Sequence, residues 1–328
     1  MFEKIMYGYA GKLLEVNLTD QTLQTELLDE SLLREYIGGT CLGAKYLMEN
    51  VPNGISWSDP RNIIFIASGP LGGTSVPGSG TFSVVTKGAL TNGATSSQAN
   101  GFFGAYMKFS GFDAIIIKGA SPKWVYLYIH DGIAELRNGE YLQGKDTWET
   151  EDAIKDDLGI PERRVSVFCI GPAGENLVRF AAIVGDRGHV VAHNGPGAVM
   201  GSKKIKALVA TRGKFIVPVR NREAISLINK DVIKGAQVRS PNTYNWGTSM
   251  IYDGHMRLNM LAIKNLTSSE FPSYKNFTGE TYRPQLEMKR TPCWACQAHH
   301  CHIVKVKSGP YSGYVGEEPE YEGLAAWG

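Results

Sequence analysis

Short apolar runs separated by turn-forming residues dominate the first two hundred positions of the chain. Apolar and polar residues alternate over residues 11–18, as they do in a half-buried strand. Short apolar runs that end near glycine or proline predict buried strands at residues 62–67, 114–117 and 165–170. Residues 124–129 and 133–137 flank Asp131-Gly132, a dipeptide that favours a tight hairpin. The first part of the chain is therefore predicted to be rich in strands.

Helical signals in this part are fewer. Asp29 begins a capping segment for a helix that we expect to run to about Ile37. Thr147 is the expected N-cap of a second helix, which runs to Leu158 and is ended by Gly159. We therefore expect short helices between the strands.

The pattern changes after Val219. Residues 221–233 place five apolar side chains on one helical face, namely Ala224, Ile225, Ile228, Val232 and Ile233. The sequence from there to residue 290 is polar and irregular, with few strand signals. A domain boundary is therefore expected near residues 212–220.

Composition narrows the class of protein. With 328 residues, 43% of them hydrophobic and 20% charged, the chain fits a globular protein of two domains. A net charge of +2 with scattered basic residues argues against nucleic-acid binding. The N-terminus carries no secretory signature, and no apolar run is long enough to span a membrane. We therefore expect a cytoplasmic protein with reduced cysteines. Cys41 and Cys169 lie in apolar contexts and are expected to be buried and inert.

A cluster of thiols and imidazoles near the C-terminal end indicates a metal site. Cys293, Cys296 and Cys301 follow a C-x2-C-x4-C spacing, which in a reducing compartment points to metal rather than disulfides. Zinc would take the three cysteines and one nearby imidazole, from His299, His300 or His302. An iron–sulfur cluster would take the three thiolates and a fourth ligand from elsewhere, for which Cys41 and Cys169 are poor candidates. The spacing alone leaves both metals open.

Two glycine-rich loops, at residues 69–80 and 195–201, are candidates for binding anions through backbone N–H groups. Neither has the spacing of a phosphate-binding P-loop. Tight turns between strands are the alternative interpretation.

The acidic stretch at residues 316–322 contains a second candidate. Glu322 leads into the apolar residues 324–327. A carboxylate drawn toward an apolar, metal-containing site has a raised pKa and can donate or accept a proton. A solvated acidic loop is the alternative.

Taken together, several segments resemble the tungsten-containing aldehyde:ferredoxin oxidoreductase family. The matching segments follow the family's order and are residues 6–8, 11–18, 36–45, 68–74, 84–87, 103–114, 170–177, 197–203, 275–277, the cysteine motif and residues 316–322. The resemblance implies an α+β fold. Residues 1–212 would form a strand-rich N-terminal domain of two packed sheets with short helices, and residues 213–328 the start of a mostly helical domain. Family members continue further, so the chain is expected to be truncated and inactive alone.

The resemblance also implies a tungsten or molybdenum bis-pterin cofactor, with Mg²⁺ as a further candidate that bridges the pterin phosphates. The family's pterin-contacting positions fall on Thr81, Gln98, Asn100, His189, Val190, Ala192 and His193. Thr81, His189 and His193 replace arginines of the best-known members, and Gln98 replaces an asparagine. Replacing these arginines weakens the binding of phosphates unless histidines or Lys87 supply the missing positive charge. Contacts made by the backbone of Val190 and Ala192 do not depend on the side chains that were replaced.

The cysteine motif corresponds to the family's [4Fe–4S] site, with one residue inserted before Cys301. Strict alignment would place His300 at the third ligand position, but a thiolate is the usual ligand. Glu322 falls on the family's active-site glutamate. The implied reaction is oxidation of a small aldehyde to a carboxylic acid, with electrons passed to ferredoxin or a partner subunit. The alternatives are a non-catalytic fragment and a zinc-stabilised binding module. The oligomeric state is left open, a homo-oligomer included.

Overall fold

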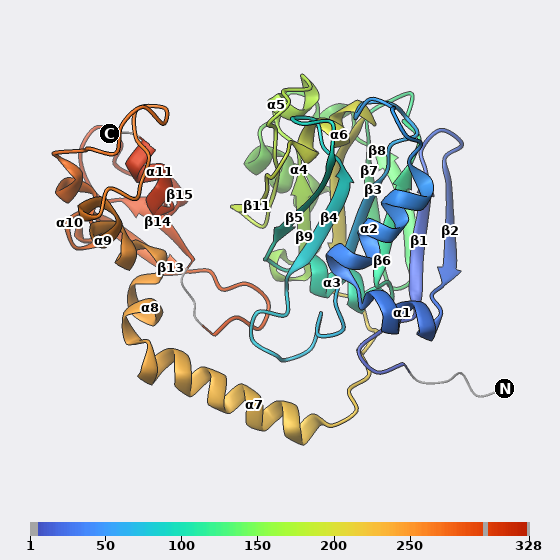
Figure 1. The fold of residues 1–328 in the computed structure, drawn as a ribbon, viewed down its shortest axis with the longest axis horizontal. Coiled ribbons are helices and arrows are strands. Elements are labelled where there is room, and N and C mark those ends of the chain that lie inside the picture. Colours follow the sequence, from blue (N-terminus) through green and yellow to red (C-terminus); the bar gives the residue numbers. More distant parts are fainter. Residues whose placement is uncertain (1–5, 298–300, 327–328) are drawn as a thin grey trace. The chain divides into compact units, whose positions relative to one another are not determined.

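The computed structural model describes residues 6–297 and 301–326. The chain divides into two compact units, Met1–Arg222 and Glu223–Gly328, called here the first and the second unit. Figure 1 shows that the first is built mainly on strands and the second on short helices with a small sheet. Among the described residues, every helix is too short or too polar to cross a membrane.

The first unit contains two six-stranded mixed sheets. One sheet has the order β2-β1-β6-β3-β4-β5, in which only the β1–β6 pair is parallel. Its strands are β1 (Lys12–Asn17), β2 (Thr22–Leu27), β3 (Ile64–Ser68), β4 (Phe82–Lys87), β5 (Ala94–Ala99) and β6 (Ala114–Lys118). The strands expected at residues 11–18, 62–67 and 114–117 are thus confirmed, to within two residues at each end.

The other sheet has the order β11-β10-β9-β12-β7-β8, in which only the β12–β7 pair is parallel. Its strands are β7 (Val125–His130), β8 (Ile133–Asn138), β9 (Val165–Cys169), β10 (Ile183–Gly185), β11 (His189–Val191) and β12 (Ile205–Thr211). The predicted hairpin is confirmed as β7–β8. Asp131 and Gly132 both have positive φ, of 42° and 84°, as a type I′ turn requires.

Six helices accompany these sheets: α1 (Glu30–Tyr36), α2 (Gly39–Asn50), α3 (Phe103–Phe109), α4 (Thr147–Leu158), α5 (Pro172–Glu175) and α6 (Pro196–Ser202). Asp29 caps α1 as predicted, since its side chain accepts a hydrogen bond from the Ser31 amide. The expected N-cap of α4 was wrong by one residue. Asp146, not Thr147, caps that helix, because its carboxylate and that of Glu149 form a reciprocal capping box.

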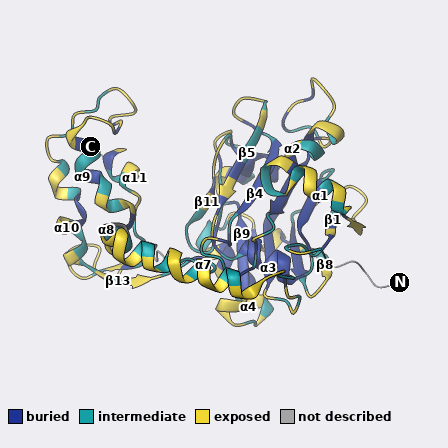
Figure 2. Cartoon of the chain, turned by 60° about the horizontal axis from the view of Figure 1, so that its bottom comes forward, coloured by how far each residue is buried: buried dark blue, intermediate teal, exposed yellow. Residues whose placement is uncertain are grey.

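The two sheets share an aromatic core. Phe82 on β4, Phe103 on α3 and Phe168 on β9 are each buried, with ring centroids 4.8–5.8 Å apart. Helix α3 contacts β3 of one sheet and β9 and β12 of the other. Figure 2 shows the strands of this interior as buried. Full burial of one such side chain contributes about 1.5 to 3 kcal/mol, so this cluster fixes how the two sheets pack.

A buried ion pair anchors the N-terminal segment to this core. Lys108 on α3 lies 2.5 Å from the Asp113 carboxylate and also donates a hydrogen bond to the Gly8 carbonyl, at 2.7 Å. Asp113 in turn accepts hydrogen bonds from the amides of Ala10 and Gly11, at 3.1 and 2.6 Å. Burial lowers the pKa of Lys108, and the Asp113 charge opposes that shift.

Gly195, at the start of α6, is a position where only glycine fits. Its φ is +70°, and an added Cβ would lie 1.8 Å from the Arg179 carbonyl oxygen. We expect Gly195→Ala to lower the free energy of unfolding by about 2 kcal/mol or more, because strain and steric overlap add. A urea titration would measure this loss. Gly54→Ala is the matched control, because Gly54 has φ of +79° but open space around it. It should cost only about 1 kcal/mol, and equal losses in the two variants would contradict the prediction.

The second unit contains five helices within the described residues: α7 (Arg222–Lys234), α8 (Pro241–Trp246), α9 (Tyr252–Arg257), α10 (Gly279–Tyr282) and α11 (Tyr321–Ala326). The predicted helix at 221–233 is confirmed as α7. Its apolar face stays largely exposed in the described chain, with Ile228 56% and Val232 43% exposed. Figure 2 shows α7 mainly in the colour of exposed residues.

The second unit also contains an antiparallel sheet that the sequence did not predict. Its strands are β13 (Leu286–Arg290), β14 (His302–Val306) and β15 (Val315–Glu317). These strands are short, and β13 and β15 contain no fully buried residue among those described. They therefore lack the apolar runs on which the prediction of strands depends.

Candidate cofactor site

The seven predicted pterin-contacting residues lie on or next to β4, β5 and β11 of the first unit. Thr81 directly precedes β4, Gln98 lies on β5 and Asn100 follows it. The other four lie on β11 or just after it, namely His189, Val190, Ala192 and His193. Strand β5 ends the order of one sheet and β11 that of the other, and the two strands lie next to each other (Figure 1). Residues far apart in sequence thus gather at one junction between the sheets.

Hydrogen bonds connect these two edges directly. The His193 amide donates to Ser97 Oγ at 3.1 Å, and Thr95 Oγ1 donates to the His193 carbonyl at 3.4 Å. Nearby, Asn194 and Thr91 exchange two hydrogen bonds, at 2.8 and 2.9 Å. These hydrogen bonds hold the backbone that follows β11 next to β5.

Side chains at the far end of this junction also contact each other. Thr81 Oγ1 donates to the Gly78 carbonyl at 3.1 Å and contacts Asn100 Oδ1. Gln98 Nε2 lies 3.4 Å from Thr40 Oγ1. The side chains at this end are thus hydroxyl and amide groups. They donate and accept hydrogen bonds without carrying a charge.

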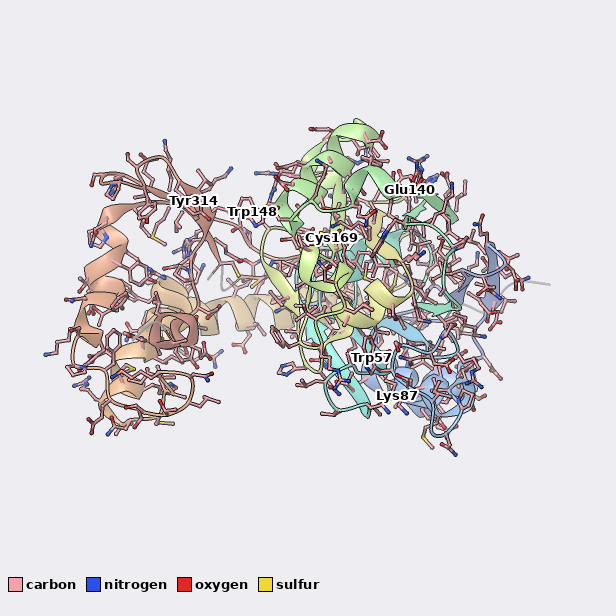
Figure 3. All side chains as sticks on the ribbon, turned by 90° about the horizontal axis from the view of Figure 1, so that it is seen from above. Trp57, Lys87, Glu140, Trp148, Cys169 and Tyr314 are labelled. Carbon is pink, nitrogen blue, oxygen red and sulfur yellow. The ribbon has the colours of Figure 1, made fainter. Side chains whose placement is uncertain are left out.

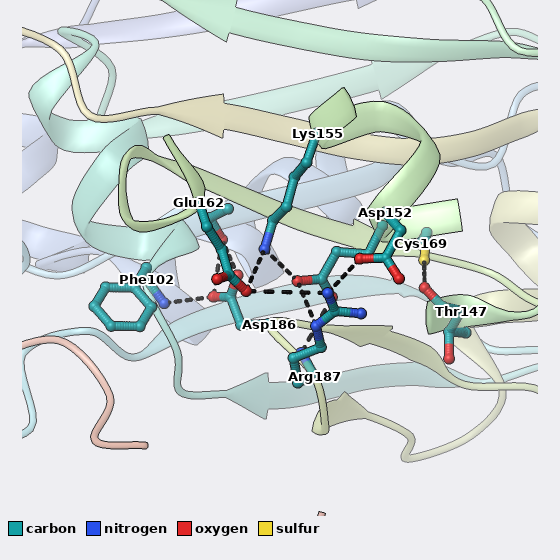
Figure 4. Close-up of polar contacts among 10 residues, drawn as sticks. Phe102, Thr147, Asp152, Lys155, Glu162, Cys169, Asp186 and Arg187 are labelled. Atoms are coloured by element: carbon teal, nitrogen blue, oxygen red, sulfur yellow. Dashed lines mark hydrogen bonds and ion pairs between the residues drawn. The ribbon is translucent and has the colours of Figure 1, made fainter. Parts of the chain in front are cut away.

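Asp186, which was not predicted from the sequence, contacts a segment next to each of the two sheets (Figure 4). Its carboxylate accepts a hydrogen bond from the Phe102 amide at 2.7 Å and lies 2.9 Å from Ser166 Oγ. Gly101 has φ of +98°, and an added Cβ there would lie 2.6 Å from Asp186 Oδ2 and 3.0 Å from His189 Cδ2. The Asp-Arg-Gly sequence at 186–188 is a turn signal that could have pointed to this position.

Arg187, the next residue, lies in a cluster of charged residues. It forms an ion pair with Asp152 and lies 3.7 Å from Glu151, while its guanidinium packs over the Trp148 ring at 4.9 Å. Lys155 pairs with Glu151 at 2.6 Å. Helix α4 thus holds the turn between β10 and β11 from one side.

The pKa of Asp186 is raised to about 6, first by burial and then by the nearby Glu151 carboxylate. Hydrogen bonds from Phe102 and Ser166 and the charge of His189 partly oppose this shift. The folded chain therefore binds a proton at Asp186 more readily than the unfolded chain does.

This pKa predicts how stability changes with pH. The stabilisation that protonated Asp186 gives the folded state is complete below about pH 4. It is lost as the pH rises through about 6, because the raised pKa favours the protonated folded state. Between pH 4 and 7 the free energy of unfolding should fall by about 2 kcal/mol in the wild type relative to Asp186→Asn, which cannot titrate. Urea titrations of both proteins across this range measure the difference, and parallel pH profiles would contradict it.

The cysteine motif of the second unit forms a compact turn. The Cys296 amide donates to the Cys293 carbonyl at 3.1 Å, and Ala295 between them has φ of 53°. The Cys301 carbonyl accepts from the Thr291 amide at 2.9 Å, and the sulfurs of Cys293 and Cys301 lie within 4.8 Å of each other. The hydrogen bond to the Cys293 thiol, together with burial, raises the pKa of Cys301. This donor set and spacing fit a metal or cluster bound by thiolates. His299 and His300 lie outside the described residues.

His302, a possible zinc ligand in the sequence analysis, instead joins a buried network around Glu318. The carboxylate of Glu318 pairs with His302 Nδ1 at 2.8 Å and accepts from Arg283 Nε at 2.7 Å and Tyr282 Oη at 2.6 Å. Burial alone would raise the pKa of Glu318, but these hydrogen bonds outweigh it and hold that pKa below its usual value. The network therefore stabilises the start of β14, the strand that follows Cys301.

Glu322, the expected proton donor or acceptor, is exposed on α11, next to Tyr321. It is not buried among apolar groups in the described chain.

The two cysteines of the first unit differ in exposure. Cys169 is buried in the interior, as predicted (Figure 3). The expectation that Cys41 is buried was wrong. Cys41 is exposed, because α2 turns Leu42 and Leu47 toward the core and Cys41 away from it.

Comparisons with known proteins match both units of the chain to one family. Residues 13–212 match the family model "Aldehyde ferredoxin oxidoreductase, N-terminal domain", and residues 223–328 match "Aldehyde ferredoxin oxidoreductase, domains 2 & 3". The tungsten-containing aldehyde ferredoxin oxidoreductase of Pyrococcus furiosus is 34% identical over 326 residues, and that of Pyrococcus abyssi 35% identical over 334. Each alignment covers 98% of this chain and 53% of the relative.

Two further proteins broaden this picture. The WOR-like subunit of the aliphatic sulfonate oxidoreductase of Pyrococcus furiosus is 32% identical over 340 residues. Among solved structures, the active site complex BamBC of benzoyl coenzyme A reductase in complex with 1,5 dienoyl-CoA has a TM-score of 0.83 and 27% identity. That match covers 95% of this chain and 49% of the other. The chain spans about half the length of the curated relatives that it matches.

Proposed function

Because the chain belongs to the aldehyde ferredoxin oxidoreductase family, we propose that it supplies the cofactor-binding part of an enzyme that oxidises aldehydes to carboxylic acids. The main support is the junction of β5 and β11, where all seven positions expected to contact pterin come together. The relatives are named as tungsten-containing, so a tungsten bis-pterin is the first candidate cofactor and molybdenum the second.

The residues at the junction would bind the pterins in two ways. Thr81, Gln98 and Asn100 offer hydroxyl and amide groups, which suit the donors and acceptors of a pterin ring. His189 and His193 would lie near the phosphates, where protonated imidazoles would replace part of the charge that arginines give in other family members. Backbone groups of Val190 and Ala192 complete the set. Mg²⁺ bridging the phosphates would lower the need for protein cations.

Cys293, Cys296 and Cys301 would hold a [4Fe–4S] cluster through their thiolates, with a fourth ligand still to be identified. When bound, the metal–pterin centre and this cluster would supply the two-electron oxidation and the path for its electrons to ferredoxin or a partner subunit. The exposed carboxylate of Glu322 would accept or donate the proton of the reaction. Reduced thiols at all these positions suit the cytoplasm.

Expression under anaerobic conditions with tungstate or molybdate tests this proposal. The purified chain should contain pterin, tungsten or molybdenum, and close to four irons per chain, with an EPR signal of a reduced cluster. Zinc with no reducible cluster would overturn the iron–sulfur assignment and favour a zinc-stabilised binding module. A cluster without pterin, tungsten or molybdenum would favour a non-catalytic fragment. Aldehyde oxidation is then measured with an artificial electron acceptor.

A further inference from the structure

The geometry points to Asp186 as a positioning residue of the pterin site, which fixes the turn after β5 against the turn between β10 and β11. This inference rests on the proposed function, since the first turn carries Asn100 and the second leads into His189. Asp186 itself would not touch the cofactor. Its role would be to set the separation between the two groups of contacts.

One side chain connects three segments at this place. Asp186 begins the turn after β10, its carboxylate accepts the Phe102 amide at 2.7 Å, and it lies 2.9 Å from Ser166 Oγ on β9. Phe102 lies two residues after Asn100, and Asp186 lies three residues before His189. The two contact groups are therefore connected by a short path through one carboxylate (Figure 4).

The side chains of Asp186 and His189 pack closely against the backbone at Gly101. Gly101 has φ of +98°, and any Cβ there would overlap Asp186 Oδ2 and His189 Cδ2, at 2.6 and 3.0 Å. Real Cβ contacts are not as close as 2.6 Å, so a larger residue at Gly101 would displace the side chain of Asp186 from its present position. Gly101 and Asp186 thus fit each other as a pair.

The turn that carries Asp186 is also strained and held in place. Asp186 and Arg187 both have positive φ, of 47° and 73°, which is uncommon for residues with side chains. Such strain persists only when surrounding contacts over-determine it, and it concentrates at functional sites. Here the contacts come from α4, through Asp152 and Glu151. A strained turn that these contacts hold in place would keep the residues of the following strand, His189 and Val190, in one fixed position.

Two substitutions of Asp186 separate positioning from charge. Asp186→Ala removes the acceptor and leaves the Phe102 amide without its partner. Asp186→Asn keeps an acceptor for Phe102, while its amide N–H can donate to Ser166 Oγ, so it removes only the charge. A positioning role therefore predicts that Asp186→Ala weakens the binding of pterin and that Asp186→Asn binds pterin as the wild type does.

The experiment measures the pterin content of each variant after anaerobic expression, from the fluorescence of the oxidised pterin released on denaturation. At limiting pterin, Asp186→Ala should bind on the order of tenfold more weakly than wild type, as changes to supporting residues do at metal sites. Asp186→Asn should match wild type. Hydrogen exchange at the Phe102 amide should be faster in the alanine variant and normal in the asparagine variant. Ile116→Val, buried on β6 and away from both edges, controls for general loss of stability.

Each result has one meaning. Wild-type pterin content in Asp186→Ala, no recovery in Asp186→Asn, or an equal loss in Ile116→Val would each overturn the positioning role while the proposed function stands. The absence of pterin from every variant, wild type included, would overturn the proposed function and this inference with it.

Discussion

Cys301→Ser should abolish the uptake of a [4Fe–4S] cluster and lower the iron content from about four per chain to near zero. The sulfurs of Cys301 and Cys293 lie within 4.8 Å of each other, so the two thiolates can reach one metal centre. A serine hydroxyl is a far weaker ligand than a thiolate for iron in such clusters. Iron and sulfide analysis, together with EPR of the reduced protein, measure the loss.

Two control variants show whether the effect is specific. Cys41→Ser should keep the full iron content, because Cys41 is exposed on α2 in the first unit. His300→Ala should also keep it if the extra residue in the motif is an insertion before Cys301. Loss of the cluster in His300→Ala with retention in Cys301→Ser would instead identify His300 as the third ligand.

Lys108→Met should lower the free energy of unfolding by about 3 to 5 kcal/mol, because it leaves the Asp113 carboxylate buried without its cation. It also removes the hydrogen bond to the Gly8 carbonyl. The double variant Lys108→Met with Asp113→Asn should recover part of the loss, since no uncompensated charge remains. Urea unfolding of the two single variants and the double variant gives the interaction energy as a double-mutant cycle.

Lys118→Met provides the comparison at a partly exposed ion pair of the first unit. Lys118 pairs with Glu15 at 2.7 Å, but both side chains are partly exposed, so water screens the pair. Its loss should cost less than about 1 kcal/mol. Equal losses in Lys108→Met and Lys118→Met would contradict the role given to the buried pair.

The elements that could be predicted from sequence are those with strong local signals. Strands β1, β3, β6 and β9, the β7–β8 hairpin and helix α7 follow from apolar runs, an Asp-Gly turn and helical periodicity. The β13–β15 sheet could not be predicted, because its strands are held by pairing with each other rather than by an apolar pattern. Cys41 was misplaced for a related reason, since the apolar residues around it belong to the opposite face of α2.

At the candidate site, too, residues with local sequence signals could be predicted, and residues that depend on long-range contacts could not. The metal-binding cysteines were predicted from their spacing, which is local in sequence, and the pterin positions from the family resemblance. That β5 and β11 are neighbours could not be predicted, because they end two different sheets. Asp186 was missed because its partners, Phe102 and Ser166, are 84 and 20 residues away. Such long-range hydrogen bonds leave no periodic signal in a single sequence.

The aromatic cluster between the sheets has a consequence for how this family can adjust cofactor affinity. Phe82 pairs across strands with Ala99, the residue before Asn100, and Phe168 pairs with Gly185, the residue before Asp186. The interior side chains that separate the two sheets therefore pair with the residue before Asn100, a proposed cofactor contact, and with the residue before Asp186, which would position the proposed cofactor site. A change of volume at Phe82 or Phe168 would widen or narrow that site without altering any group that touches a ligand. These core positions would be overlooked in a comparison limited to the proposed ligand-contacting residues.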